Sequence, residues 1–122
     1  MKKLRNALVL AGSLAVALFA NAASAQSRAD ALGWKLGAQA WTFNRFTFAE
    51  ALDKMDSCGI QYVEAFPGQE IGGGIEGKFD YHMPPSKQEE VKALLKKKHK
   101  VLVAFGVVVP ASAAEWRMLF DF

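Results

Sequence analysis

The sequence predicts an α/β fold in which parallel β-strands alternate with helical crossovers. Three apolar segments with strand character, 35–43, 60–66 and 101–109, are each followed by a helix-start signal. Polar and glycine residues gather in the connections that lead from strand to helix. The last segment is a continuous apolar run, which is typical of a parallel strand covered on both faces. This alternation fits either an open doubly wound sheet or a (β/α)8 barrel.

Each helix is predicted from a capping box, in which Ser or Thr is followed three residues later by Glu. The three pairs are Thr47 with Glu50, Ser86 with Glu89, and Ser112 with Glu115. Apolar residues at helical spacing follow each pair, and Gly59 is expected to end the first helix at its C′ position.

The longest connection, 67–85, follows the second strand and is predicted to be a flexible active-site loop. Gly72, Gly74 and Gly77 match the G-x-G-x-x-G spacing of dinucleotide-binding sites. That motif requires the last glycine to open a helix. Here the segment 78–85 ends in two prolines, which defer the helix, so the match does not indicate a nucleotide site.

The N-terminal segment, residues 1–25, has the pattern of a secretory signal peptide. A basic start is followed by the apolar run 7–20 and by small residues at 23–25, so cleavage is expected after Ala25. The apolar run is short for a membrane span of about 20 residues. We therefore expect an exported, periplasmic or secreted protein with no membrane attachment after cleavage, and a linker at 26–34.

Charge and cysteine content exclude further classes. Lys2, Lys3 and Arg5 account for the whole formal excess of +3, so the mature chain is close to neutral and no nucleic-acid partner is predicted. The basic cluster 96–100 is interpreted as a solvated helix end. Cys58 is the only cysteine, and it is expected to be a small buried thiol.

The candidate site lies on one face of the first two strands. Period-two alternation places Gln39 and Trp41 of the first strand, and Glu64 and Phe66 of the second, on the face opposite Val63 and Ala65. A buried carboxylate is costly unless it is paired. Glu64 is therefore either a ligand-binding carboxylate or a structural acid paired with a lysine, an arginine or a backbone amide, and both interpretations stay open.

Asp80 and His82 are further candidates for ligand contacts in the long connection. An Asp-x-His pair is a weak signal, because a metal site needs about three or four protein ligands. The residues themselves therefore predict no metal site, and no catalytic residue is assigned.

Four segments together resemble the sugar phosphate isomerase/epimerase family, which are xylose isomerase-like TIM barrels with hydroxypyruvate isomerase-like members. The segments are KLGAQAWTF (35–43), TFAEALDKMDSCGIQYVEAFPGQ (47–69), KFDYHMP (78–84) and LVAFGVV (102–108). A complete barrel takes roughly 250 residues. We therefore expect residues 35–122 to be the first three βα units of a truncated barrel, ending within the third helix.

The resemblance implies a function and a cofactor for a full-length protein. It would isomerise or epimerise a small sugar or hydroxy-carbonyl substrate by proton transfer next to a carbonyl, with Mn²⁺, Mg²⁺ or Co²⁺ held by residues of later strands. By resemblance, Glu64, Trp41 and Phe66 shape the substrate pocket, and Gln39 and His82 are candidate substrate contacts. The fragment itself is expected to bind no metal and to be inactive.

A second hypothesis is a non-enzymatic exported module that binds sugar or a partner through its three-unit sheet. An unpaired apolar edge at 101–109 weighs against an independently stable module. Assembly of several fragments into a composite barrel ranks last, since it would lack the chemistry of the later strands.

Overall fold

The computed structural model describes residues 28–122. The predicted signal peptide, 1–25, lies outside the described residues. The chain divides into two compact units, Met1–Leu36 and Gly37–Phe122, which are described separately. In the first unit, residues 28–31 are helical and stand within the predicted linker. None of the described helices combines the length and the apolar character that a membrane crossing requires.

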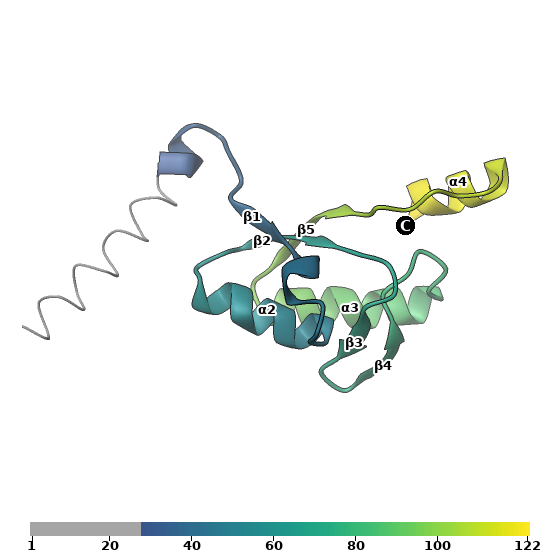
Figure 1. The fold of residues 1–122 in the computed structure, drawn as a ribbon, viewed down its shortest axis with the longest axis horizontal. Coiled ribbons are helices and arrows are strands. Elements are labelled where there is room, and N and C mark those ends of the chain that lie inside the picture. Colours follow the sequence, from purple (N-terminus) through teal and green to yellow (C-terminus); the bar gives the residue numbers. More distant parts are fainter. Residues whose placement is uncertain (1–27) are drawn as a thin grey trace, which may run out of the picture. The chain divides into compact units, whose positions relative to one another are not determined.

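The second unit holds five strands and three α-helices (Figure 1). In chain order the elements are β1 (Gly37–Gln39), the 3-10 helix η1 (Ala40–Phe43), α2 (Phe48–Ser57), β2 (Tyr62–Ala65), β3 (Glu70–Gly72), β4 (Ile75–Lys78), α3 (Pro85–Lys97), β5 (Val101–Phe105) and α4 (Ala113–Asp121). The strands β1, β2 and β5 form a parallel sheet in that order, and β3 and β4 form an antiparallel pair. The predicted α/β class with parallel strands and helical crossovers is confirmed.

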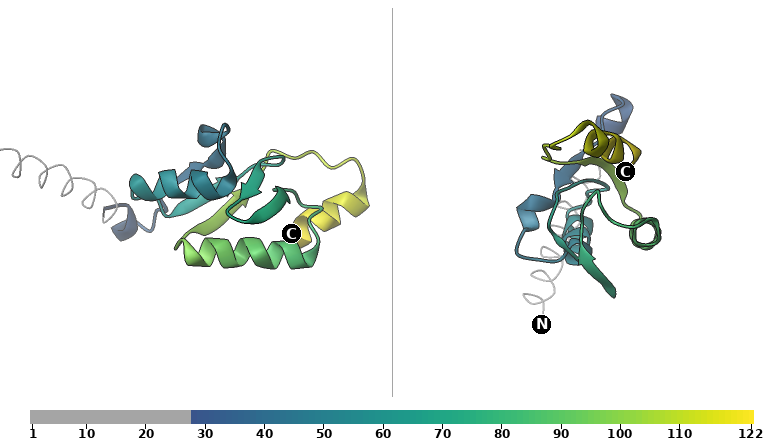
Figure 2. Two further views of the ribbon diagram at one scale, coloured as in Figure 1. Left: turned by 90° about the horizontal axis from the view of Figure 1, so that it is seen from below. Right: turned by 90° about the vertical axis from the view of Figure 1, so that its right-hand side faces the viewer.

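The core lies on one face of the parallel sheet. Val63 and Ala65 of β2 are fully buried, as their alternation with Glu64 predicts. They pack in one cluster with apolar residues of α2 and α3, and Figures 1 and 2 show both helices lying along the sheet. The register pairs Val63 with Leu102 and Ala65 with Phe105, so β5 also contributes to this face.

Local sequence signals explain helix α2. The Thr47 side chain accepts from the Glu50 backbone N–H, and the Glu50 carboxylate accepts from the Thr47 backbone N–H, so the predicted capping box is present. The helix stops before Gly59, which has φ +69° as a C′ glycine does. Cys58, at the C-cap, is exposed, so the prediction of a buried thiol is wrong.

Helix α3 begins at Pro85, two residues earlier than the predicted capping box at Ser86 and Glu89 would place it. Pro84 is the N-cap and Pro85 occupies the first turn, with no side-chain cap. Proline is suited to this position because its φ is already helical and its missing N–H has no partner to lose. The predicted box at Ser86 and Glu89 is therefore not formed. At α4, Ser112 does cap the Glu115 N–H at 3.2 Å, while the Glu115 carboxylate accepts from Ala111 N.

The basic segment 96–100 is not uniformly solvated. The Lys100 side chain is only 4% exposed, and its Nζ donates to Asp56 Oδ1 at 2.7 Å and to the Ile60 carbonyl at 2.9 Å. Lys98 pairs with Asp53. These contacts tie the end of α3 to α2, which the sequence could not reveal because the partners lie far apart in the chain.

The long connection 67–85 is an ordered hairpin and not a flexible loop. Its strands β3 and β4 turn at Gly73 and Gly74, both with positive φ. Ile71 and Phe79 are buried in the core, so the hairpin is anchored by apolar side chains at both of its ends. The prediction of flexibility failed because it gave too little weight to these two residues.

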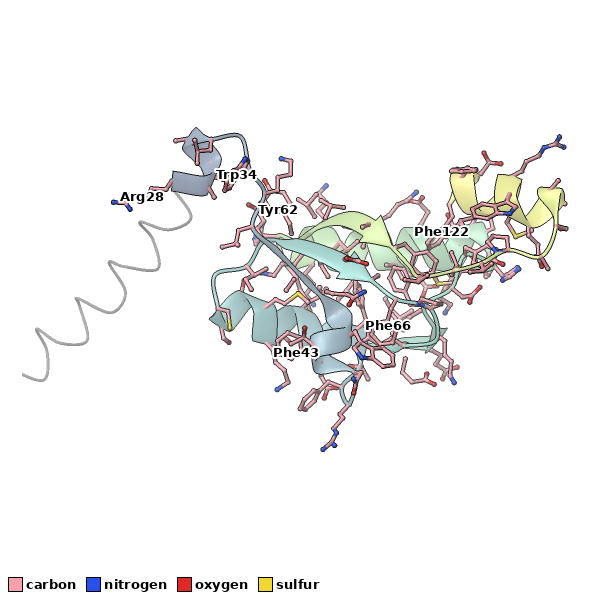
Figure 3. The ribbon with its side chains drawn as sticks, turned by 45° about the horizontal axis from the view of Figure 1, so that its top comes forward. Arg28, Trp34, Phe43, Tyr62, Phe66 and Phe122 are labelled. Carbon is pink, nitrogen blue, oxygen red and sulfur yellow. The ribbon has the colours of Figure 1, made fainter. Side chains whose placement is uncertain are left out.

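Strand β5 is shorter and more exposed than predicted. It spans Val101–Phe105, and the remainder of the predicted segment 101–109 is not strand. Val103 is 51% exposed, so β5 is not covered on both faces. Within 37–122 it pairs only with β2. Phe122, which is labelled in Figure 3, follows α4. Its ring contacts the rings of Phe105 and Phe79.

Candidate functional site

Gln39 and Glu64 meet at the carboxyl ends of β1 and β2. The parallel register places these two residues opposite each other. Gln39 Nε2 donates to Glu64 Oε1 at 3.0 Å, and both side chains are partly buried. The partner of Glu64 is thus a side-chain amide of the neighbouring strand. The second carboxylate oxygen has no hydrogen-bond partner among residues 28–122. The shared face predicted from alternation is confirmed for Gln39 and Glu64.

Trp41 and Phe66 form an aromatic pair beside these polar groups. Their ring centroids are 4.9 Å apart in an edge-to-face arrangement. Phe66 is 8% exposed and lies close to η1 in Figure 3. Trp41 is 58% exposed, since β1 ends at Gln39 and η1 carries Trp41 out of the strand. Strand alternation therefore does not place Trp41, but the pairing with Phe66 still brings it to the site.

A hollow of about 330 Å³ opens at the ends of the three parallel strands. It is called the strand-end hollow, and it is lined by Gln39, Trp41, Phe66, Pro67, Gly106 and Val107. Each strand supplies lining residues at its carboxyl end or just after it. This is the edge where open α/β sheets and (β/α)8 barrels bind their ligands. One amide and two aromatic rings line it. Glu64 is not a lining residue, but its carboxylate accepts a hydrogen bond from the Gln39 amide.

His82 does not join this group. Its Nδ1 lies 2.6 Å from Asp80 Oδ1, and its ring stacks against Tyr81 with the centroids 4.0 Å apart. The imidazole is about half exposed and does not line the strand-end hollow. Burial raises the pKa of Tyr81, with smaller contributions from the carboxylates of Glu115 and Asp80. Asp80 and His82, the two candidate ligand contacts of the long connection, pair with each other within their own loop.

A divalent metal does not fit the described residues. No group of three His, Cys, Asp or Glu side chains that could hold an ion occurs in 28–122. The arrangement can form hydrogen bonds and apolar contacts with a ligand.

A second hollow, called the outer hollow, was not predicted. Its volume is about 560 Å³, and its charged and amide lining comes from Asn44, Arg45, Glu50, Gln69, Glu70 and Lys78. These residues belong to three separate segments, so sequence spacing could not bring them together. Thr47 donates to the Glu50 carboxylate from its backbone and its hydroxyl, and these bonds hold the pKa of Glu50 below its usual value.

Comparison with known proteins shows fold similarity without a named activity. No family model matches the chain, and no curated protein matches it. The crystal structure of an uncharacterized protein from Parabacteroides distasonis ATCC 8503 is similar, with 33% sequence identity and a TM-score of 0.68. The match covers 72% of this chain and 38% of that one, so the chain spans well under half the length of this similar protein. The α/β arrangement of parallel strands and helices is therefore shared with a longer protein.

Proposed function

We propose that this chain forms the first three βα units of a (β/α)8 barrel in an exported sugar (phosphate) isomerase or epimerase. Three features support the proposal. The strands β1, β2 and β5 are parallel, α2 and α3 pack on one face of the sheet that they form, and Gln39 and Glu64 occupy its other face. The similar protein from Parabacteroides distasonis is also much longer than the matched part.

The observation that carries the proposal is the pairing of Gln39 with Glu64 next to Trp41 and Phe66. A carboxylate and an amide offer both acceptors and donors for sugar hydroxyls. Aromatic rings offer an apolar surface to the C–H face of a sugar ring. The strand-end hollow combines the amide and the two rings at the edge where a barrel places its active site, and the Glu64 carboxylate is hydrogen-bonded to that amide.

The roles proposed for this chain are in binding and orientation. Isomerisation next to a carbonyl removes a proton from one carbon and returns a proton to its neighbour, through an enediolate. Glu64 and Gln39 would hold substrate hydroxyls, and Trp41 and Phe66 would exclude water from one side. By resemblance, the groups that move protons and bind Mn²⁺, Mg²⁺ or Co²⁺ belong to later strands. The 122-residue chain is therefore expected to be inactive alone.

Sugar binding tests the site directly. Isothermal titration of the chain with glucose and xylose should show weak binding that Gln39→Leu and Glu64→Ala reduce at least about tenfold, the loss of a charge-assisted hydrogen bond. Lys92→Ala is the matched control, because Lys92 pairs with Glu89 on the exposed side of α3. Equal binding by the wild type and both site variants would contradict the proposed site.

Activity and chain length are tested separately. The purified chain with added Mn²⁺, Mg²⁺ or Co²⁺ should convert no aldose to ketose above a metal-free control, and measurable conversion would disprove its inactivity.

The intact mass of the endogenous protein, captured with an antibody to 86–100, should match a complete barrel. Its N-terminal sequence should begin after Ala25 if the signal peptide is cleaved.

The alternative function is a non-enzymatic exported module that binds sugar or a partner. The Gln39–Glu64 pair is compatible with this alternative, because an amide and a carboxylate can bind sugar hydroxyls without any residues from later strands. This alternative predicts a mass near that of residues 26–122, cooperative thermal unfolding of a monodisperse chain, and sugar binding without turnover.

A further inference from the structure

The two hollows share a wall. Trp41, Phe66 and Pro67 line both the strand-end hollow and the outer hollow. Phe66 is buried and makes an edge-to-face contact with the Trp41 ring, while more than half of the Trp41 surface stays exposed. A ligand that fills the strand-end hollow therefore has a second hollow within reach past the same indole.

The outer hollow is polar and electrically balanced. Arg45 and Lys78 bring two positive charges, and Glu50 and Glu70 bring two negative ones. Glu50 is held by Thr47, and Glu70 lies 3.7 Å from Lys78. Arg45 has no ion pair within residues 28–122, so its guanidinium is available as a hydrogen-bond donor. Balanced charge favours a neutral polar ligand over a phosphate or a cation.

Gln69 adds a buried acceptor to this hollow. The residue is 4% exposed, and its Nε2 donates to the Phe46 carbonyl at 3.2 Å. Its Oε1 is buried and has no hydrogen-bond partner among the described residues. The backbone of Gln69 is fixed at the base of the hairpin, because its main-chain carbonyl accepts a hydrogen bond from the Phe79 backbone N–H at 2.7 Å. Leaving a buried acceptor unpaired is unfavourable. A rotation of the Gln69 side chain toward the hollow that it lines would bring Oε1 to a ligand hydroxyl.

We propose that the outer hollow is a subsite for a second sugar ring, and that the ligand of this protein is a disaccharide or another glycoside. The inference rests on the proposed function, since it places the first ring in the strand-end hollow. The second ring would pack on the exposed side of Trp41, accept from Arg45 and donate to Gln69 Oε1. A free monosaccharide fills only one of the two hollows.

Binding of matched sugars tests this inference. The full chain is titrated by calorimetry with glucose, maltose, cellobiose and glucose 6-phosphate. At least one disaccharide should bind about tenfold tighter than glucose, the gain expected from one charge-assisted hydrogen bond and its neighbours. Arg45→Ala and Gln69→Leu should each remove most of this gain and leave glucose binding unchanged. Gln39→Leu should weaken the binding of every sugar by a similar factor.

The outcomes separate the inference from the proposed function. If glucose binds but neither disaccharide binds tighter, the inference is wrong and the proposed function stands. If glucose 6-phosphate is preferred and Arg45→Ala removes that preference, the hollow is an anion site and the inference is wrong. If no sugar binds, both fail. Because Gln69→Leu also alters a buried residue of the hairpin, the decisive comparison of disaccharide and glucose binding uses Arg45→Ala, whose side chain is exposed. Lys92→Ala is the control variant and should bind every sugar as the wild type does.

Discussion

The amide of Gln39 donates to the carboxylate of Glu64 at 3.0 Å and joins the carboxyl ends of β1 and β2. The two residues are exact neighbours in the parallel register. The bond holds the Glu64 carboxylate on the sheet face opposite the core, where no lysine or arginine of residues 28–122 forms an ion pair with it. It therefore orients a carboxylate at the strand ends, where a ligand hydroxyl can also reach it.

Replacing Gln39 by leucine should destabilise the chain. The half-buried Glu64 carboxylate would lose its partner, at a cost of about 1–2 kcal/mol in the free energy of unfolding. Glu64→Gln keeps an amide–amide hydrogen bond possible and should change stability by less than about 0.5 kcal/mol. Urea unfolding monitored by circular dichroism measures both. An equal loss in the two variants would contradict the assigned role of the bond.

Two hairpin glycines should respond differently to alanine. Gly72 and Gly74 both have positive φ, but a Cβ at Gly72 would lie 2.5 Å from Thr47 Cβ, whereas Gly74 has no atom within 4 Å. Gly74→Ala should cost about 1 kcal/mol from backbone strain alone. Gly72→Ala adds a clash that displaces the α2 cap, for a total of about 3 kcal/mol. Urea midpoints should rank the variants in this order, and a reversed order would refute the packing of the hairpin on Thr47.

The Asp56–Lys100 pair should make stability depend on pH. The hydrogen bond from Lys100, followed by its charge, lowers the pKa of Asp56 below its ordinary value of 3.8. Because the pKa is lower in the folded state, the stabilisation is complete above the ordinary value and is lost as the pH falls through the lowered one. Asp56→Asn should therefore be less stable than the wild type at pH 7, by a margin that shrinks below pH 3.8.

Asp121→Asn is the control for this pH series, because the Asp121 carboxylate has no hydrogen-bond partner in the part of the chain that the structure describes. Its stability should follow the wild type at every pH. Thermal unfolding from pH 7 to pH 2.5 measures the three proteins, and a constant difference between the wild type and Asp56→Asn would contradict the prediction.

The edge of β5 should promote self-association of the isolated chain. Within 37–122, β5 is hydrogen-bonded to β2 on one side and to no strand on the other, and the side chain of Val103 in β5 is half exposed. Charged residues on an edge strand oppose pairing with another chain. Val103→Lys should therefore lower the sedimentation coefficient at high protein concentration, whereas Val109→Lys, outside the strand, should have a smaller effect. Identical sedimentation of both variants and the wild type would show that this edge does not associate.

Local signals predicted a substantial part of the fold. The Thr47–Glu50 box and Gly59 define α2 because each interaction spans only a few residues. Alternation correctly separated Val63 and Ala65 from Glu64, since the side-chain period of a strand is two. The box at Ser86 failed where a competing local rule applied, because two prolines started α3 before it.

The hairpin was missed although its signal is in the sequence. Glu70–Gly72 and Ile75–Lys78 flank a pair of glycines, which is the pattern of two strands joined by a tight turn. These glycines were interpreted instead as part of a flexible active-site loop. The buried Ile71 and Phe79 distinguish the hairpin from such a loop, because a flexible loop has no reason to place large apolar residues in the core.

The sequence alone determined the alternation of the three parallel strands with α2, α3 and α4, the capped start of α2 and the shared face of Gln39 and Glu64, because neighbouring residues encode all of these. Only the tertiary structure decided which distant groups meet. Lys100 finds Asp56 across 44 positions, and Arg45, Gln69 and Lys78 line one hollow from three segments. Such contacts depend on how the elements pack, and no local periodicity encodes the distance between residues that the packing brings together.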